Sequence, residues 1–226
     1  KRLLDQQAES TEENERPTWR SIGETFRNGG RLVRASPLLL TIVAIPLLLG
    51  LSSEGLDRLW TAHVVTNFTL PTFGPLNPVT WFAVIRGSVM IGGIIGVEVI
   101  QRHFKEDAKG AVPRLLLILT LVQITCVLTF ALAGNFALAL ISYCAYAVLR
   151  SCASPIYANW LTQNSDAKVR ATIISMSGQL DAMGQIVGGP IVGVIGTLAS
   201  IRAALLAVGA LMTPVLFLFM RALRLE

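Results

Sequence analysis

Residues 170–193 read RATIISMSGQLDAMGQIVGGPIVG, a long apolar helix pattern that also holds a carboxylate, several glycines and a proline. Glycines four residues apart let the backbone of a neighbouring helix come close in lipid. A proline removes a backbone donor that neighbouring groups must replace, and a carboxylate at this depth is costly enough to indicate a function. The stretch therefore predicts a membrane helix that packs closely, can bend and lines a polar space. The residues that we expect to pack or bend it are Gly184, Gly188, Gly189, Pro190 and Gly193.

The composition of the whole chain is that of a membrane protein. Of its 226 residues, 53% are hydrophobic and 15% are charged, and the apolar residues gather in long runs. The net charge of +5 does not indicate a nucleic-acid partner, because the basic residues lie between apolar runs rather than on one surface. The sequence opens with Lys1 and shows no signal-peptide pattern, so we expect a fragment of a longer protein.

The apolar runs predict an all-α membrane protein with six spans, since crossing the hydrocarbon core takes about 20 residues. The expected spans are Pro37 to Thr61, Val79 to Ile100, Pro113 to Ala133, Phe136 to Trp160, Ala171 to Leu198 and Ile201 to Leu223. Residues 36–226 would form this bundle, and residues 1–35 a cytoplasmic linker. From Pro17 onwards the linker has the pattern of an amphipathic helix on the membrane surface, although a solvated basic helix fits as well.

The basic residues predict the orientation of the spans. Lys and Arg gather before the first span, between the second and third, between the fourth and fifth, and after the sixth, while the other connections are nearly bare. Cytoplasmic connections carry an excess of Lys and Arg, so both termini are expected in the cytoplasm. We therefore expect a multi-pass integral protein, placed in a bacterial inner membrane.

Charged residues within the first two spans form one candidate constellation. Glu54, Asp57 and Arg58 share a helix face, which indicates a bundle interior or a water-filled cavity, or else a helix end wetted by solvent. Arg86 in the second span lies at a similar depth, and an ion pair with Glu54 or Asp57 would be either structural or part of a gate.

A second constellation lies near the predicted middle of the membrane. Arg150 and Asp181 sit at matching depths on consecutive spans, so we expect them to pair. Such a pair would bind substrate, exchange protons or only cancel charge. Gln179 and Gln185 accompany Asp181 on its helix and are included in the expected transport path.

Nothing in the sequence predicts catalysis, a metal site or a cofactor. His63 and His103 fall in loops or at span ends on opposite sides of the membrane. The cysteines lie inside apolar spans, their number is odd, and their spacing fits no metal site or disulfide framework. We therefore expect a protein that is not an enzyme. The cysteines are Cys126, Cys144 and Cys152.

Two stretches resemble helices of the major facilitator superfamily of transporters. The stretch from Arg170 through Gln185 to Gly188-Gly189-Pro190-x-x-Gly193 resembles the penultimate helix of such proteins, and Glu54-Gly-x-Asp-Arg-Leu-Trp60 with His63 resembles the seventh helix of drug-efflux-like members. The loop after the second span departs from the family pattern. Its only matches are Arg102, Lys105 and Asp107.

The resemblance covers nearly the whole chain and implies the C-terminal six-helix half of such a transporter. In this family substrate binds between two six-helix halves, so the implied partners are an N-terminal six-helix half, a small-molecule substrate and the lipid bilayer. The implied function is secondary active transport, with proton-coupled efflux of small molecules. A nontransporting scaffold or receptor-like bundle is one alternative, and an intramembrane enzyme is another.

Overall fold

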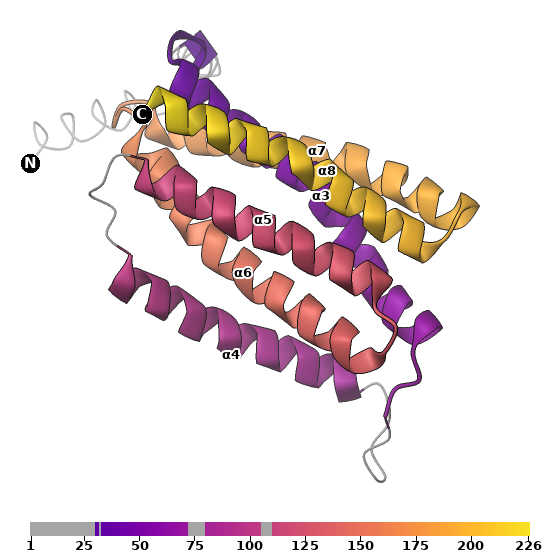
Figure 1. The fold of residues 1–226 in the computed structure, drawn as a ribbon. Helices are drawn as coiled ribbons and strands as arrows, with labels where there is room; N and C mark the ends of the chain where they lie inside the picture. Colours follow the sequence, from indigo (N-terminus) through magenta and orange to yellow (C-terminus); the bar gives the residue numbers. More distant parts are fainter. Residues whose placement is uncertain (1–29, 32, 72–79, 105–109) are drawn as a thin grey trace, which may run out of the picture.

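Six long helices make up the protein in the computed structural model, which describes residues 30, 31, 33–71, 80–104 and 110–226. All six are long and apolar enough to cross a membrane, and the described ranges contain no strand. The chain is thus an all-α, multi-pass membrane protein (Figure 1). The helices are α3 (Pro37–Asn67), α4 (Thr80–His103), α5 (Ala111–Leu132), α6 (Phe136–Gln163), α7 (Arg170–Leu198) and α8 (Ile201–Leu225).

The six predicted spans are confirmed, with one clear difference in length. The predicted first span ends at Thr61, whereas α3 continues to Asn67. The additional residues include Val64, which is buried in the apolar core, so packing extends the helix beyond its most hydrophobic part. The expected linker of residues 1–35 lies almost wholly outside the described residues. Within it, Val33 is only 3% exposed.

Side-chain caps mark where three of the helices begin. The hydroxyl of Ser36 accepts a hydrogen bond from the Leu39 amide at 3.3 Å, directly before a proline in the first turn of α3. Asn135 caps α6 and Ser200 caps α8 in the same way, at 2.8 and 3.0 Å. Each cap satisfies an amide that the helix itself leaves without a partner.

Helix α3 is the centre of the bundle. It packs against α7 and α8, while α5 packs against α8 and α6, and α4 lies at one edge against α6 (Figure 1). In the most apolar window of each helix, 56% of the residues are buried in α3, but only 11% in α4 and 17% in α7. Large faces of α4 and α7 are therefore open to whatever surrounds the bundle.

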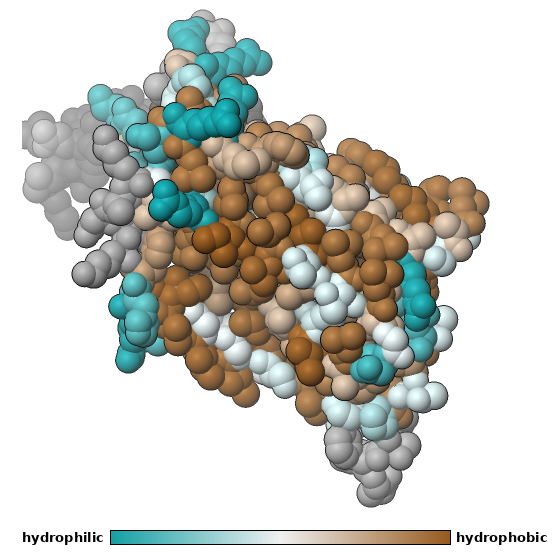
Figure 2. Space-filling model, in the orientation of Figure 1, coloured by the Kyte–Doolittle hydropathy of each residue, from teal (hydrophilic) through white to brown (hydrophobic). Residues whose placement is uncertain are grey.

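The surface of the bundle has the distribution expected of a membrane protein. Figure 2 shows apolar side chains over most of one face, with hydrophilic residues gathered towards its two ends. Inside, two apolar clusters hold the helices together. One surrounds Trp60 and Phe130 near the end of α3, and the other surrounds Trp160 and Phe219 near its beginning.

The glycines of α7 meet the backbone of α3. A Cβ atom at Gly184 would overlap the Leu47 carbonyl oxygen, and one at Gly188 would overlap the Leu51 carbonyl. The fit is reciprocal, because a Cβ at Gly50 of α3 would overlap the carbonyl of Asp181. The two backbones are thus in direct contact, as small residues permit in membrane helices.

The remaining residues of the predicted packing stripe are placed differently. A Cβ at Gly189 would lie 3.1 Å from the Glu54 side chain, whereas one at Gly193 would meet nothing within 4 Å. Gly193 therefore makes no close contact, because it borders the open groove that Glu54 and Arg58 of α3 also line. Pro190 is exposed within a helix that runs on to Leu198.

Candidate functional site

A cavity of about 300 Å³ lies inside the bundle, between the two apolar clusters. Side chains of α3, α5, α6, α7 and α8 all contribute to its wall. Its size is at the lower end of the range for small-molecule sites in proteins. The polar residues of the wall are Ser52, Ser53, Thr120, Gln123, Tyr146, Arg150, Ser154, Tyr157, Ser177 and Asp181.

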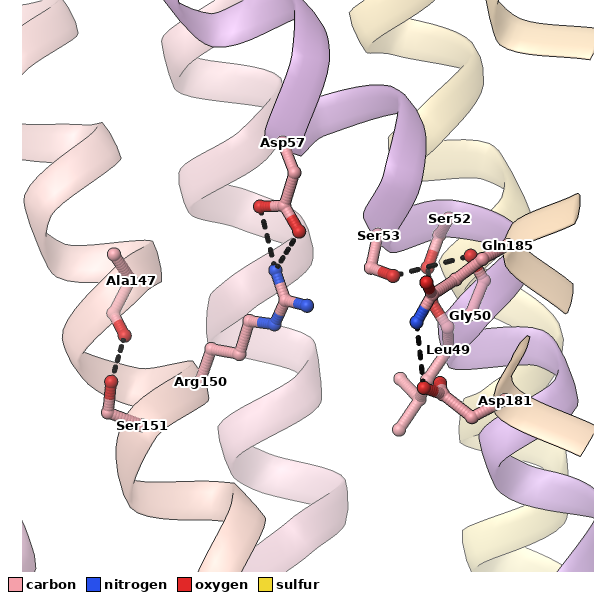
Figure 3. Close-up of polar contacts among 10 residues, drawn as sticks. All are labelled: Leu49, Gly50, Ser52, Ser53, Asp57, Ala147, Arg150, Ser151, Asp181 and Gln185. Carbon is pink, nitrogen blue, oxygen red and sulfur yellow. Dashed lines mark hydrogen bonds and ion pairs between the residues drawn. The ribbon is translucent and has the colours of Figure 1, made fainter. Parts of the chain in front are cut away.

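An ion pair between α3 and α6 lies at the cavity. One guanidinium nitrogen of Arg150 lies 2.9 Å from both carboxylate oxygens of Asp57 (Figure 3). The side chains are 42% and 49% exposed, so neither charge is sealed into the core. The pair therefore joins two helices at a position that water or a ligand can reach.

The predicted pair of Arg150 with Asp181 is corrected by this geometry. Asp181 instead accepts a hydrogen bond at 2.8 Å from the Gln185 amide, one turn along α7 (Figure 3). Among the described residues, Asp181 makes no ion pair. The reason is the packing order, since α7 packs mainly on α3 and barely touches α6. Asp181 and Arg150 nevertheless line the same cavity.

The predicted ion pair of Arg86 is also replaced. Its guanidinium lies over the ring of Trp60, 5.2 Å from the ring centroid, and Trp60 in turn stacks on Tyr143 at 4.5 Å. An aromatic face attracts a cation in this geometry. The two carboxylates expected to pair with Arg86 have other partners. Asp57 pairs with Arg150 on α6, and Glu54 pairs with Arg58 on α3.

The side chains of the predicted polar face of α3 point in two different directions. Glu54 pairs with Arg58 at 2.5 Å, and both line a groove on the outside of α3 and α7 that also includes Gln185. Asp57 points instead towards α6. Adjacent positions on a helix differ by about 100° around its axis, which separates Asp57 from Arg58.

Several cavity residues had no place in the sequence prediction. The Tyr157 hydroxyl donates to the Ile42 carbonyl oxygen at 3.1 Å and lies 3.2 Å from the Ser177 hydroxyl. Thr120 and Gln123 are both buried on α5. They are three residues apart on one face of an otherwise apolar run, and this spacing was the available signal. Gln179, by contrast, is exposed and does not line the cavity.

His63 lies in the last two turns of α3, close to the predicted end of the first span. Its side chain is fully buried, its Nε2 donates to the Phe130 carbonyl oxygen at 3.1 Å, and its Nδ1 accepts from the Asn67 amide at 3.2 Å. These partners suit a neutral imidazole that joins α3 to α5. Within the described ranges, no three His, Cys, Asp or Glu residues gather to hold a metal ion.

Comparison with known proteins adds no assignment. No protein-family model matches the chain, and no curated protein matches it. The class that the fold defines is an all-α integral membrane protein with six spanning helices. Any narrower statement of function rests on the cavity and on the open faces of α4 and α7.

Proposed function

We propose that the chain is the C-terminal six-helix half of a secondary active transporter of the major facilitator type, which exports small molecules in exchange for protons. The observation that carries the proposal is the polar cavity within a membrane bundle, with the Asp57–Arg150 pair and Asp181 in or at its wall. Ionisable residues inside membrane bundles usually mark substrate or ion pathways.

The charges at the cavity are poorly explained by packing alone. A purely structural pair in a membrane is best shielded from the solvent, but Asp57 and Arg150 are each close to half exposed. Asp181 has an amide rather than a cation beside it. Burying a charge in the bilayer costs at least about 2.5 kcal/mol, so water or a ligand has to compensate for it.

The two acidic groups suit different roles in coupled transport. Asp57 is held by Arg150, so a change in its protonation would break a link between α3 and α6. Asp181 can take up or release a proton without breaking an ion pair among the described residues. We therefore assign the proton-carrying role to Asp181 and the role of a breakable link to the Asp57–Arg150 pair.

The open faces of α4 and α7 support a second half. Arg86 and Ser88 on α4 and Gln179 on α7 are all exposed. Polar residues on spanning helices rarely face lipid, so a partner surface or a water-filled space should cover them. A matching six-helix half across the cavity would provide both. The alternation of basic and bare connections supports placing both termini in the cytoplasm, and we assign the protein to a bacterial inner membrane.

Transport by the full-length protein in liposomes tests the proposal. With a pH-sensitive dye in the lumen and an imposed proton gradient, a panel of amphipathic fluorescent dyes should include compounds whose movement is coupled to protons. Asp181→Asn should remove the proton movement while leaving insertion intact. A folded wild-type protein that moves neither protons nor any dye would contradict the proposal and favour a nontransporting scaffold.

A further inference from the structure

A second groove, of about 570 Å³, opens at the end of the bundle where α3 begins. Its walls are apolar and come from the first turns of α3 and from α7, with Val43 and Ala44 on one side and Met176 and Leu180 on the other. Because α3 and α7 are membrane spans, this groove lies along the hydrocarbon layer. Its shape and chemistry suit a hydrocarbon chain rather than a polar solute.

Two guanidinium groups stand at the mouth of this groove. Arg31 and Arg34 line it and lie just before Ser36, the residue that caps the spanning helix. They are three residues apart, which places them on one side of a helical turn. Neither makes a hydrogen bond or ion pair with a described residue. Both are therefore available to an anion at the level of the lipid headgroups.

The segment that carries these arginines is held in place by the core. Val33, between them, is 3% exposed and belongs to the apolar cluster that includes Leu39 and Ile42. The segment is thus anchored over the start of α3, and the two cations have a fixed place relative to the apolar walls. A cationic mouth above an apolar channel matches the two chemical parts of an anionic lipid.

We propose that this groove binds an anionic phospholipid, with its phosphate on Arg31 and Arg34 and an acyl chain between α3 and α7. Arginine presents several donors in a planar fork that suits phosphate oxygens. Arginines beside the cytoplasmic end of a span also meet the anionic lipids of that leaflet. The site needs only that the helices lie in a membrane with the start of α3 at the cytoplasmic side, so it rests on the proposed orientation but not on the transport proposal.

Native mass spectrometry of the full-length protein tests this site. The protein is taken from nanodiscs that contain equal amounts of phosphatidylglycerol and phosphatidylcholine with the same acyl chains. We expect preferential retention of phosphatidylglycerol. Each arginine at the membrane surface should strengthen binding about fivefold, so R31Q/R34Q should reduce retention about 30-fold.

The matched control is R221Q/R224Q. It removes the same charge from the end of α8, at the same end of the bundle, but neither residue lines the groove. We expect this variant to retain phosphatidylglycerol as the wild type does. Equal losses in the two double variants would show a general effect of surface charge and would overturn the proposal, as would a wild type that retains neither lipid.

A second set of measurements tests the apolar part of the site. Ala44→Phe, with Ala44→Leu as a milder form, should fill the channel and lower lipid retention without changing charge. Glycerol phosphate, which has the headgroup chemistry without acyl chains, should not displace the lipid. Displacement by glycerol phosphate together with normal retention in both Ala44 variants would show a simple phosphate site and would overturn the proposed lipid site.

Discussion

At the scale of single residues, the pairing of Arg150 with Asp57 separates two roles that a pairing with Asp181 would have combined. Arg150 holds α3 to α6 through a carboxylate that is half exposed, whereas Asp181 remains on α7 with Gln185 beside it. A ligand or a proton can therefore act on the two acidic groups independently. Substitutions at Asp57 and Asp181 should have different consequences.

Asp57→Asn should lower stability only modestly, because both members of the pair are partly exposed. We expect a loss of about 1 kcal/mol, or a melting temperature lower by about 2–4 °C in detergent. The charge-reversed double variant Asp57→Arg/Arg150→Asp should recover most of this loss. The single variants Asp57→Arg and Arg150→Asp complete the comparison. If the double variant loses as much free energy of unfolding as these two single variants added together, the two residues do not interact as the structure shows.

Asp181→Asn should leave the protein folded and abolish coupled proton movement. An asparagine oxygen can still accept the hydrogen bond from Gln185, and Arg150 keeps its partner Asp57, so no buried cation is left alone. Thr197→Ala is the control, since Thr197 is exposed on the same helix outside the cavity and its hydroxyl bonds only its own helix. Unchanged proton-coupled transport in folded Asp181→Asn protein would remove Asp181 from the proton path.

The charged residues of this site could be found from sequence, but their partners could not. A charge in an apolar run is conspicuous because it is costly there. The partner depends on which helices touch, and consecutive spans such as α6 and α7 need not be neighbours. Neutral cavity residues such as Gln123 and Tyr157 were missed because a single polar group in an apolar run does not reveal which other helices it reaches; the Tyr157 hydroxyl, for example, contacts α3 and α7.

At the scale of helices, the contact between α3 and α7 depends on positions where no side chain fits. Gly188→Leu should destabilise the protein by about 3 kcal/mol or more, because its side chain would have to displace the Leu51 backbone. Gly193→Ala is the matched control and should be neutral or slightly stabilising, since its methyl group meets nothing within 4 Å. Thermal unfolding in detergent and the level of folded protein measure both effects.

Equal stability of these two variants would contradict the packing of α7 on α3. The sequence predicted that this glycine stripe packs closely, but it included Gly193, whose Cβ would meet nothing within 4 Å. Which glycines take part depends on the rotation of α7 about its axis, which the partner helix sets. Gly50, the reciprocal position on α3, has no neighbouring glycine four residues away and so gave no stripe to detect.

A clasp at one end of the bundle joins three further elements. The carboxylate of Glu226, after α8, accepts one hydrogen bond from the indole of Trp160 on α6 and another from the amide of Gly110, before α5, each at 2.8 Å. Glu226→Ala should cost about 1–3 kcal/mol, because two part-buried donors lose their partner. Arg224→Ala, at the same end, is the control for the loss of a charged side chain.

Thermal unfolding measures the stability of Glu226→Ala and Arg224→Ala. The variant Trp160→Phe removes only the hydrogen bond between the Trp160 indole and Glu226. If Glu226→Ala is as stable as Arg224→Ala, the clasp does not contribute to folding. Such a contact between distant parts of the chain leaves no local pattern in the sequence. The helices themselves were predictable because each is a continuous apolar run of sufficient length.

At the scale of the whole molecule, the two apolar clusters lie on either side of a polar, partly open cavity. Tyr146 and Met212 belong to one cluster, Leu116 and Phe219 to the other, and all four line the cavity. Fixed packing at both ends leaves the middle of the bundle as the place where polar groups meet. The proposed second half would cover the open face of α7, which contributes Ser177 and Asp181 to the cavity wall.

Access of water to this cavity separates a transport pathway from a sealed polar core. In a cysteine-free background, Ser177→Cys places a thiol in the cavity wall, whereas Ser142→Cys places one at a position that does not line it. The two serines are equally buried, at 6% and 5% exposure, so burial alone predicts equal labelling. A membrane-impermeant thiol reagent should label Ser177→Cys and spare Ser142→Cys, because only the cavity connects to water. In a transporter, a transported dye should also change the side of the membrane from which labelling is faster. If both thiols resist labelling, the cavity is closed to solvent and its charges are structural.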